Sequence, residues 1–358
     1  MRVDKGGGNR HMKCTVVVPT IREHSIREFL AAWDQILSWA HVIVVEDSPT
    51  QTFDLSAYSH VTHFSWQDID RDLGADSWII PRRTDCIRSY GFWKAYHDHP
   101  DMVITLDDDC YPSENGSFFI DTHWNALSQP AQSEAWQVTG EGVPTIGLPY
   151  FQRHREWPCL LNHGLWDQVP DFDAPTQLIQ ARLPGAFHPV NQIIPVGRYF
   201  PMCGMNIAFR PELIPALYFL LMGQGYQYDR FGDIWSGIIV KKICDHLGYA
   251  IKSGAPIVTH KRASNVWANL RKEAPGLEVN EEFWQVIDRL RLSGTTIIEC
   301  YQEMAQSLTL GGPYWSALRE AMVLWTTLFD RDAASAESPS STILEPHPTP
   351  VLKSALSS

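Results

Sequence analysis

Three short apolar runs near the start of the chain constrain its fold more than any other feature. They span residues 14–19 (CTVVVP), 41–46 (HVIVVE) and 102–106 (MVITL), and uninterrupted apolar runs of this length are typical of strands buried on both faces. A helix is predicted between the first two runs, because Ser25 and Glu28 have the spacing of a capping box. Its apolar face consists of residues at helical spacing: Ile26, Phe29, Leu30, Trp33 and Leu37. Strand, helix and strand in this order predict an α/β fold with a mostly parallel sheet.

The second half of the chain predicts one more helix and strand, followed by helices alone. Residues 128–200 are rich in Pro, Gly and aromatic residues and have little periodicity, so we expect long ordered loops there. Residues 232–247 predict a helix that stops at Gly248, and residues 250–260 predict the last strand. Apolar stripes then predict three C-terminal helices, at 280–292, 295–308 and 313–330.

These patterns divide the chain into four segments. Residues 1–12 (MRVDKGGGNRHM) have the character of a vector-derived leader, with Met12 as the native start. Residues 13–275 are expected to form the α/β domain, and residues 276–332 a C-terminal helical extension. Residues 333–358 are rich in Ser, Pro and Ala, and we expect this tail to be disordered.

Composition and charge narrow the class of protein. The chain is 44% hydrophobic and 20% charged, which suits a globular protein with a full core, and its formal net charge is −12 without a basic stripe, so we expect no nucleic acid partner. No run approaches the ~18–20 apolar residues that span a membrane, and no secretory signal is visible. The seven cysteines form no CxxC pair, which favours free thiols in a reducing cytoplasm.

Asp107, Asp108 and Asp109 directly follow the third apolar run. Ligands of parallel sheets bind at the carboxyl ends of the strands, and Thr20 and Asp47 follow the first two runs at the same edge. Three adjacent carboxylates repel one another and are hard to ionise together without a cation. Carboxylate oxygens suit Mg²⁺ or Mn²⁺, which in turn bind a diphosphate. The triplet therefore predicts a metal and diphosphate site, with an acidic turn or a helix N-terminus as the alternative.

Other polar residues could complete a nucleotide site. Asp47 could accept a hydrogen bond from a nucleobase or a ribose, or it could be a turn-forming residue before Ser48-Pro49. Arg82, Arg83 and Arg88 form a basic cluster in an acidic chain, and arginine fits phosphate oxygens in a bidentate manner. The alternative for each of these arginines is a solvated helix face.

Two further motifs leave more than one role open. Asp229 and Asp233 flank a glycine in DRFGDIW and could act as a base or as ligands of sugar hydroxyls, while an N-cap is an equal alternative for Asp233. His260 ends the last predicted strand, where it could bind a metal or phosphate or serve as a structural histidine.

Seven ordered blocks over roughly residues 14–275 resemble the reversibly glycosylated polypeptides, the UDP-arabinopyranose mutases of plants. The C-terminal helices match less clearly. The blocks are 16–22 (VVVPTIR), 105–111 (TLDDDCY), 163–178 (HGLWDQVPDFDAPTQL), 200–210 (FPMCGMNIAFR), 229–237 (DRFGDIWSG), 240–248 (VKKICDHLG) and 259–265 (THKRASN).

The resemblance implies a glycosyltransferase-A-like fold, with a Rossmann-like sheet and an acidic triplet that holds Mn²⁺ or Mg²⁺. It also implies an enzyme that interconverts the pyranose and furanose forms of a nucleotide-linked sugar, as a homo-oligomer. On this basis we expect three metal ligands (Asp107, Asp109 and His260). We also expect six residues to bind the nucleotide-diphosphate sugar: Thr20, Arg22, Asp47, Arg82, Arg88 and Asp108.

The sequence departs from the plant pattern in two places that would lie near the nucleobase. The plant second strand ends in a Gln-Asp-Gly-Asp type motif, whereas this chain has residues 46–49 (EDSP), and residues 80–89 (IPRRTDCIRS) also differ. Arginine outnumbers lysine and the tail is Ala-rich, which favours the family's actinobacterial branch. That branch is linked to nucleoside antibiotics and uses GDP-L-galactose, so we expect this substrate first and UDP-L-arabinopyranose second.

Two other functions would use the same fold. A metal-dependent glycosyltransferase would pass the sugar to an acceptor instead of isomerising it. A non-catalytic partner subunit of a mutase assembly is the third reading, which the intact acidic triplet argues against.

The family's glycosylated arginine follows a GxPxxxR pattern, which corresponds here to Gly147, Pro149 and Arg153, with Arg155 as the alternative. A mutase must release C1 from the diphosphate, open the ring and let O4 replace O5 on C1. Arg153 could hold C1 covalently in the interval, which divides one hard step into easier ones. A protonated guanidinium is a poor nucleophile, so a carboxylate would have to accept its proton: Asp171, Asp173 or Asp233. Alternatively, Arg153 only stabilises the departing diphosphate electrostatically.

We expect Arg153→Lys and Arg153→Ala to lose both mutase activity and label transferred from radioactive nucleotide sugar, while Arg155→Ala keeps both. Lost activity without any label on the wild-type protein would favour the electrostatic role. Unchanged activity in both Arg153 variants would remove this residue from the mechanism.

Overall fold

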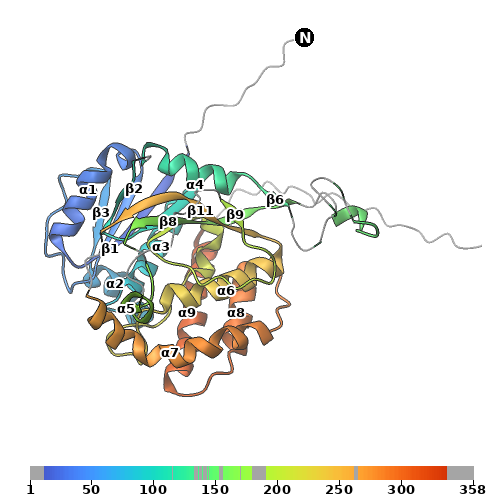
Figure 1. The fold of residues 1–358 in the computed structure, drawn as a ribbon. Helices are drawn as coiled ribbons and strands as arrows, with labels where there is room; N and C mark the ends of the chain where they lie inside the picture. Colours follow the sequence, from blue (N-terminus) through green and yellow to red (C-terminus); the bar gives the residue numbers. More distant parts are fainter. Residues whose placement is uncertain are drawn as a thin grey trace, which may run out of the picture.

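The structure, a computed structural model, is built around one large sheet with helices on both faces (Figure 1). It describes residues 12–114, 116–132, 136, 139, 143, 145–152, 156–169, 171–179, 191–261 and 265–336, without the side chains of 331–336. In this part of the chain the neighbouring strands of the sheet are, in spatial order, β3 (Val61–Phe64), β2 (His41–Glu46), β1 (Cys14–Thr20), β4 (Met102–Leu106), β10 (Asn206–Phe209), β8 (Cys159–Gln168), β11 (Ala250–His260) and β5 (Cys110–Pro112).

The sheet is mostly parallel. Strands β3, β2, β1 and β4 pair in parallel, as do β8 and β11, whereas β10 runs antiparallel between β4 and β8. Strand β5 and the short β9 (Gln192–Ile193) pair antiparallel with β11. This arrangement, with helices at the C-terminal end of the chain, confirms the predicted glycosyltransferase-A-like, Rossmann-like class.

Alternating residues of the central strands enter two separate cores. Val16 and Val18 of β1 pack with α1 (Glu23–Leu37) and α4 (Phe119–Ser128) on one face of the sheet. Val17 enters the opposite core, which also contains α3 (Arg88–His97). Because successive side chains of a strand point to opposite faces, a fully apolar β1 can serve both layers. The strand bounds predicted from the apolar runs agree with β2 and β4, and β1 extends one residue further, to Thr20.

The first helix has the predicted buried face but a different start. Ile26, Phe29 and Trp33 are among its buried residues, as expected. The capping box at Ser25 and Glu28 is wrong, because α1 already begins at Glu23 and its N-cap, Arg22, forms no side-chain cap. An acidic residue in the first turn favours this earlier start through the helix dipole.

The segment 128–200 is more regular than the sequence indicated. It contains the ten-residue strand β8, which lies between β10 and β11 in the sheet, and the short helix α5 (Ala174–Ile179). The remaining short elements of the described chain are α2 (Trp66–Leu73), β6 (Ala131–Gln132), β7 (Glu156–Trp157) and the 3₁₀ turns Gly74–Ile79, Asp85–Ile87, Gly116–Phe118, Tyr150–Gln152 and Pro211–Ala216.

The helix α6 (Gly232–Leu247) has the predicted bounds, and Gly248 ends it in the left-handed conformation at φ 79°. The next helix, α7 (Val266–Arg289), is much longer than the predicted segment 280–292 and passes through Pro275. A Cβ on Gly276 would lie 2.4 Å from the Phe231 ring, so α7 packs closely on the segment before α6 at this glycine. The boundary drawn at residue 275 therefore falls inside a helix.

The last two helices complete the same core as the sheet. They are α8 (Ile297–Ser307), which starts at a Thr296–Glu299 capping box, and α9 (Pro313–Ala336). Trp315 of α9 stacks on Trp235 of α6, and Cys300 of α8 is also fully buried. Helix α9 continues past residue 332 to Ala336, and residues 337–358 lie outside the described part of the chain.

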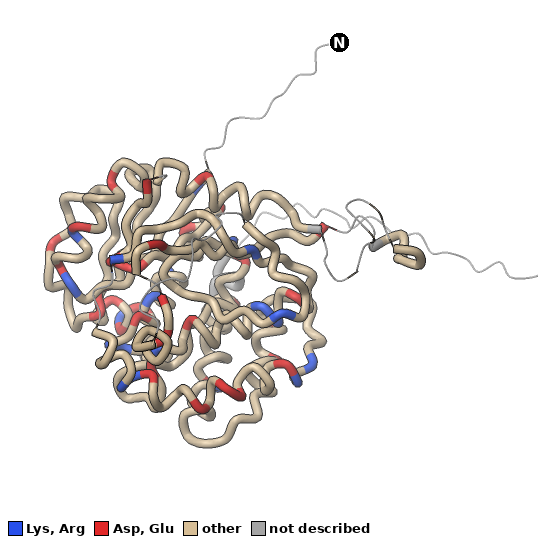
Figure 2. The backbone as a smooth tube through the Cα atoms, viewed as in Figure 1, with Lys and Arg blue, Asp and Glu red and all other residues tan. Residues whose placement is uncertain are grey.

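Three further features of the described residues concern their helices, their charged side chains and their cysteines. None of their helices is both long enough and apolar enough to cross a membrane. Figure 2 shows Lys and Arg interspersed with Asp and Glu, without a continuous basic band on the side in view. All seven cysteines have free thiols, as the sequence predicted.

We expect Gly91→Ala to lower the free energy of unfolding by about 1–3 kcal/mol, although alanine favours helices. A Cβ at this position of α3 would lie 2.4 Å from Cγ1 of Val17, inside the core. The matched control is Gly311→Ala, whose Cβ would meet nothing within 4 Å. Denaturant unfolding measures both variants, and a Gly91 variant as stable as the control would contradict this account of α3 packing.

Candidate functional site

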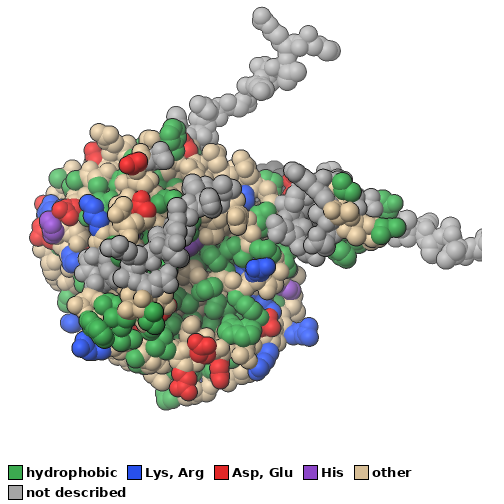
Figure 3. Space-filling model, in the orientation of Figure 1, with side chains coloured by type: hydrophobic (Ala, Val, Ile, Leu, Met, Phe, Trp, Pro, Cys, Tyr) green, Lys and Arg blue, Asp and Glu red, His purple; other side chains and the backbone are tan. Residues whose placement is uncertain are grey.

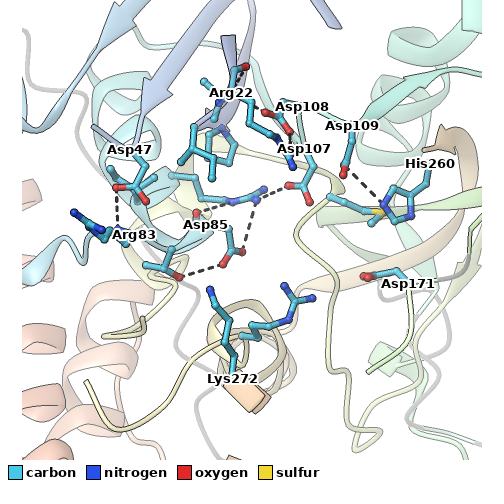
Figure 4. A pocket seen from close by; sticks show the side chains of 18 residues that line it. Arg22, Asp47, Arg83, Asp85, Asp107, Asp108, Asp109, Asp171, His260 and Lys272 are labelled. Atoms are coloured by element: carbon cyan, nitrogen blue, oxygen red, sulfur yellow. Dashed lines mark hydrogen bonds and ion pairs between the residues drawn. The ribbon is translucent and has the colours of Figure 1, made fainter. Parts of the chain in front are cut away.

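A cavity of about 470 Å³ lies at the carboxyl ends of β1, β2 and β4 (Figure 4). This is where parallel sheets bind ligands, because the loops that follow the strands diverge there. The lining residues that the sequence singled out are Thr20, Arg22, Asp47, Arg83, Arg88, Asp107, Asp108, Asp109, Asp171 and His260. The cavity therefore brings together residues from six separate segments of the chain, of which the strand-end argument had placed Thr20, Asp47 and the aspartate triplet.

The repulsion within the aspartate triplet is relieved by two arginines. Arg22 donates to Asp108 at 2.6 Å, and Asp108 also accepts a hydrogen bond of 2.6 Å from Thr20. Arg88 donates to Asp107 at 2.5 Å. Burial raises the pKa of Asp108, and the hydrogen bonds from Thr20 and Arg22 oppose that rise. The sequence argument assumed that only a metal ion would offset the charge of these carboxylates. In the structure Arg22 and Arg88 also supply positive charge to them.

Arg88 is a buried cation that joins the walls of the site. Its side chain is 1% exposed, and it donates to Asp107, to Thr105 of β4 and to the carbonyl oxygens of Gly204 and Asp85. A buried guanidinium requires such partners, since an unpaired one would be very costly. Arg88 therefore orients Asp107, and most of its donors are occupied by protein atoms.

His260 and Asp109 face each other in the same cavity, with Nε2 of His260 at 3.8 Å from Oδ1 of Asp109. Nδ1 of His260 lies 2.9 Å from the carbonyl oxygen of Val169, which can only accept a hydrogen bond. The proton of a neutral His260 ring is therefore on Nδ1, and the lone pair of Nε2 points toward Asp109. This is the arrangement in which a histidine ligates a metal.

In the described ranges, however, no three His, Cys, Asp or Glu side chains are grouped closely enough to hold a metal ion alone. Asp107, Asp109 and His260 line one cavity without forming a closed ligand cage. Mg²⁺ characteristically takes one or two protein carboxylates together with substrate phosphates. The residues present fit a cation that shares its coordination with a bound diphosphate.

Asp47 directly follows β2 and is held by the first residue of α2 and by the segment after that helix. Its Oδ1 accepts hydrogen bonds from the Trp66 indole at 2.7 Å and from the Arg83 backbone at 2.9 Å. Burial raises the pKa of Asp47, and these hydrogen bonds counter the rise. Arg82 does not line the cavity, because its guanidinium donates to the Ile80 carbonyl and to Asp70. The neighbouring Arg83 takes the position in the cavity that the sequence reading assigned to Arg82.

A second compartment of about 740 Å³ adjoins the first and shares Asp85, Arg88, Asp107, Asp171 and Arg230 with it. Figure 3 shows a recess near the middle of the face in view, with hydrophobic side chains gathered below it. The compartment is lined by both apolar and acidic side chains, among them Trp166, Phe231, Asp173 and Asp233.

The acidic residues of this compartment differ in environment. Asp171 accepts a hydrogen bond from the Cys203 thiol at 2.6 Å, and burial raises the pKa of this aspartate. Burial also raises the pKa of Asp233 to about 7, with a further contribution from Asp85. The two oxygens of Asp233 accept from the backbone N–H groups of Gly204 and Ile234, so it also fastens the 201–205 loop to α6. Exposed Asp173 caps α5 through Thr176.

Two candidate residues lie outside the described part of the chain, and three residues that line the cavity were not selected from the sequence. Arg153 and its alternative Arg155 are outside the described residues. Asp85, Arg230 and Lys272 line the cavity but were not selected, although Arg230 lies inside the DRFGDIW motif. Asp85 and Arg230 are charged side chains near motif residues, a signal that is too frequent in sequences to be diagnostic, and Lys272 lies outside every motif that the sequence showed.

Fold and site together define an α/β protein of the glycosyltransferase-A-like class, with an acidic cavity at the carboxyl ends of its parallel strands. The model of one family, Reversibly glycosylated polypeptide, matches residues 10–334, and the chain belongs to that family. It is 34% identical to the probable UDP-arabinopyranose mutase 1 of Pisum sativum, over 88% of this chain and 90% of the relative. It is 33% identical to UDP-arabinopyranose mutase 1 of Arabidopsis thaliana, over 88% and 91%. UDP-arabinopyranose mutase 1 of Oryza sativa subsp. japonica is also 33% identical, over 88% and 90%.

If a divalent cation bridges Asp109 and the diphosphate, we expect Asp109→Ala to weaken binding of a nucleoside diphosphate in Mg²⁺ by at least about tenfold, while the protein stays folded. Removal of metal with EDTA should produce a similar loss in the wild type. The matched control is Asp34→Ala, an exposed aspartate on α1. Calorimetric titration is the measurement, and equal affinity with and without metal would contradict the bridging cation.

Proposed function

We propose that this protein is a mutase that interconverts the pyranose and furanose forms of a UDP-linked sugar, with UDP-arabinopyranose as the first candidate. The observation that carries the proposal is the acidic cavity at the strand ends, in a chain that matches the plant enzymes over most of its length. The adjoining compartment provides room for a sugar next to a diphosphate. A cytoplasmic location and a homo-oligomeric state are part of the proposal.

The hydrogen bonds of Asp47 favour uracil over guanine as the base. Its Oδ1 already accepts from Trp66 and Arg83, and the Thr84 backbone also donates to this carboxylate, so at most one further acceptor position is left for a ligand. The Watson–Crick edge of uracil offers one N–H donor, which one oxygen satisfies. Guanine offers two adjacent donors, and a carboxylate pairs with both only when both of its oxygens are available. This geometry supports a UDP-sugar over the GDP-L-galactose that the sequence favoured, and nothing in the relatives' names supports GDP.

A bound Mg²⁺ or Mn²⁺ would orient the diphosphate and neutralise the charge that it gains as it leaves C1. The residues that would hold the cation are Asp109, Asp107 and His260, of which His260 offers the Nε2 lone pair. Thr20 and Arg22 keep Asp108 turned to β1, so that this carboxylate shapes the loop before α1.

The chain's own residues have two tasks in the sugar compartment. Trp166 and Phe231 give it apolar walls, which limit the access of water to C1 when the bond to the diphosphate breaks. Asp233, whose pKa burial raises to about 7, can exist in either protonation state near neutral pH. It is therefore suited to exchange a proton with a sugar oxygen while the ring opens and recloses. Arg153 remains the candidate to hold C1 in the interval.

The test is NMR of nucleotide sugars incubated with the protein and Mg²⁺. We expect UDP-arabinopyranose to be converted to its furanose form without any acceptor. Asp47→Ala should lower kcat/KM for the UDP-sugar by about 10- to 100-fold, because a buried hydrogen bond to a charged group is lost. Asp34→Ala on the outer face of α1 again serves as the control.

Three outcomes would contradict the proposal in distinguishable ways. Conversion of GDP-sugars alone would show that the base is wrong while the mutase class stands. Net transfer to an added acceptor, without isomerised nucleotide sugar, would favour a glycosyltransferase. No conversion of any sugar, in protein that binds nucleotides tightly, would favour a non-catalytic subunit.

A further inference from the structure

We propose that Arg230 and Lys272 form a cationic clamp for the diphosphate, with Arg230 on the β-phosphate and Glu273 as the residue that positions it. The inference rests on the proposed function only in that the ligand is a nucleotide-diphosphate sugar. In Figure 4 Lys272 points into the cavity from the side that faces the aspartate triplet. The clamp would thus hold the diphosphate from the side opposite the strand ends.

A diphosphate bound in this cavity needs cationic N–H donors that are not already occupied by carboxylates of the protein. Arg22 is paired with Asp108, and Arg88 is paired with Asp107. Arg230 and Lys272 line the same cavity from other segments of the chain; each is paired with one carboxylate, Glu273 and Asp229 respectively, and has further N–H donors besides. A diphosphate carries two or more negative charges, and arginine matches phosphate oxygens with two parallel N–H donors.

Arg230 presents its donors in a suitable way. Its Nε donates to Oε1 of Glu273 at 2.9 Å, which fixes the plane of the guanidinium. No described residue accepts a hydrogen bond from its Nη1 or Nη2, and the side chain is 34% exposed. Two donors on one edge of an immobilised guanidinium are therefore available to a ligand in the cavity.

The backbone of Arg230 supports a functional reason for this placement. Its φ is 67°, in the left-handed region that a bulky residue seldom adopts. The strained conformation is held by a hydrogen bond of 2.9 Å from the Arg230 N–H to Asp229. Such residues persist where the surroundings over-determine them, and they cluster at ligand clamps and active sites.

Glu273 is the point at which three segments meet. It is 3% exposed, and its Oε2 accepts a hydrogen bond of 2.6 Å from the Ala174 backbone, at the start of α5. The neighbouring Lys272 lies 3.1 Å from Oδ2 of Asp229. Glu273 thus ties the Arg230 segment to α7 and to the loop that carries Asp171.

Arg230 also lies where the reacting bond must be. It lines both the cavity at the strand ends and the adjoining compartment. The phosphate nearest the sugar, the β-phosphate, has to lie at this junction if the nucleotide fills the first cavity and the sugar fills the second. When the C1–O bond breaks, the electron pair goes to the β-phosphate oxygen, whose charge Arg230 would stabilise.

The experiment compares UDP with UMP, which lacks the β-phosphate, by calorimetric titration in Mg²⁺. We expect Arg230→Gln to weaken UDP binding by about 10- to 100-fold and UMP binding by less than about threefold. Glu273→Gln should give a smaller loss with the same preference for UDP. The matched control is Arg198→Gln, an exposed arginine in a separate hollow, which should change neither affinity.

An equal loss for UDP and UMP, or unchanged UDP binding, would overturn the clamp. If Arg230→Gln does not fold, Lys272→Gln is tested in its place, because the Lys272 side chain is 51% exposed. This variant should likewise weaken the binding of UDP and leave the binding of UMP unchanged. GDP and GMP are titrated in parallel. A selective loss for GDP would refute the uracil assignment and still support the clamp.

Discussion

Arg88 places a positive charge inside the protein, and the edge of the sheet is organised around it. The guanidinium joins β4 through Thr105, the 201–205 loop through Gly204 and the triplet through Asp107. Each contact satisfies a donor that would otherwise be buried without a partner. The same contacts set the direction of Asp107 and hold together the two compartments. A replacement that removed this charge would therefore disturb the position of several walls at once.

Arg22, the second arginine that pairs with the aspartate triplet, fixes the loop after β1. Arg22 and Thr20 both engage Asp108, so the chain leaves β1 in a fixed direction before α1 begins. Asp108 is thus part of the scaffold, Asp107 is oriented by Arg88, and Asp109 faces His260 across the cavity. Three adjacent residues of one type thus have three different sets of contacts in the structure.

The sequence predicted the strands whose apolar runs are continuous, because burial on both faces leaves no room for polar residues. It did not predict β8, whose middle contains Asn162 and His163. Asn162 is buried because its side chain donates to the Ala255 carbonyl and contacts His123, partners that come from distant segments. The start of α7 at Val266 was missed for a different reason: Pro275 and Gly276 normally interrupt a helix, so the sequence placed the helix after them. The aspartate triplet was predictable because it is local, whereas Arg230 and Lys272 meet only through tertiary packing.

The docking of α7 beside the cavity links ligand occupancy to the stability of this part of the molecule. Glu273 and Lys272 belong to α7, and Gly276 lets the helix approach the Phe231 ring. A ligand that binds only when α7 is docked adds a free energy of RT ln(1 + [L]/Kd) to the docked state. With the proposed clamp in place, an undocked α7 would therefore be rarer in the occupied protein than in the empty one. By the same linkage, a change far along α7 that favours the docked helix would tighten the binding of a ligand held by Lys272 and Arg230.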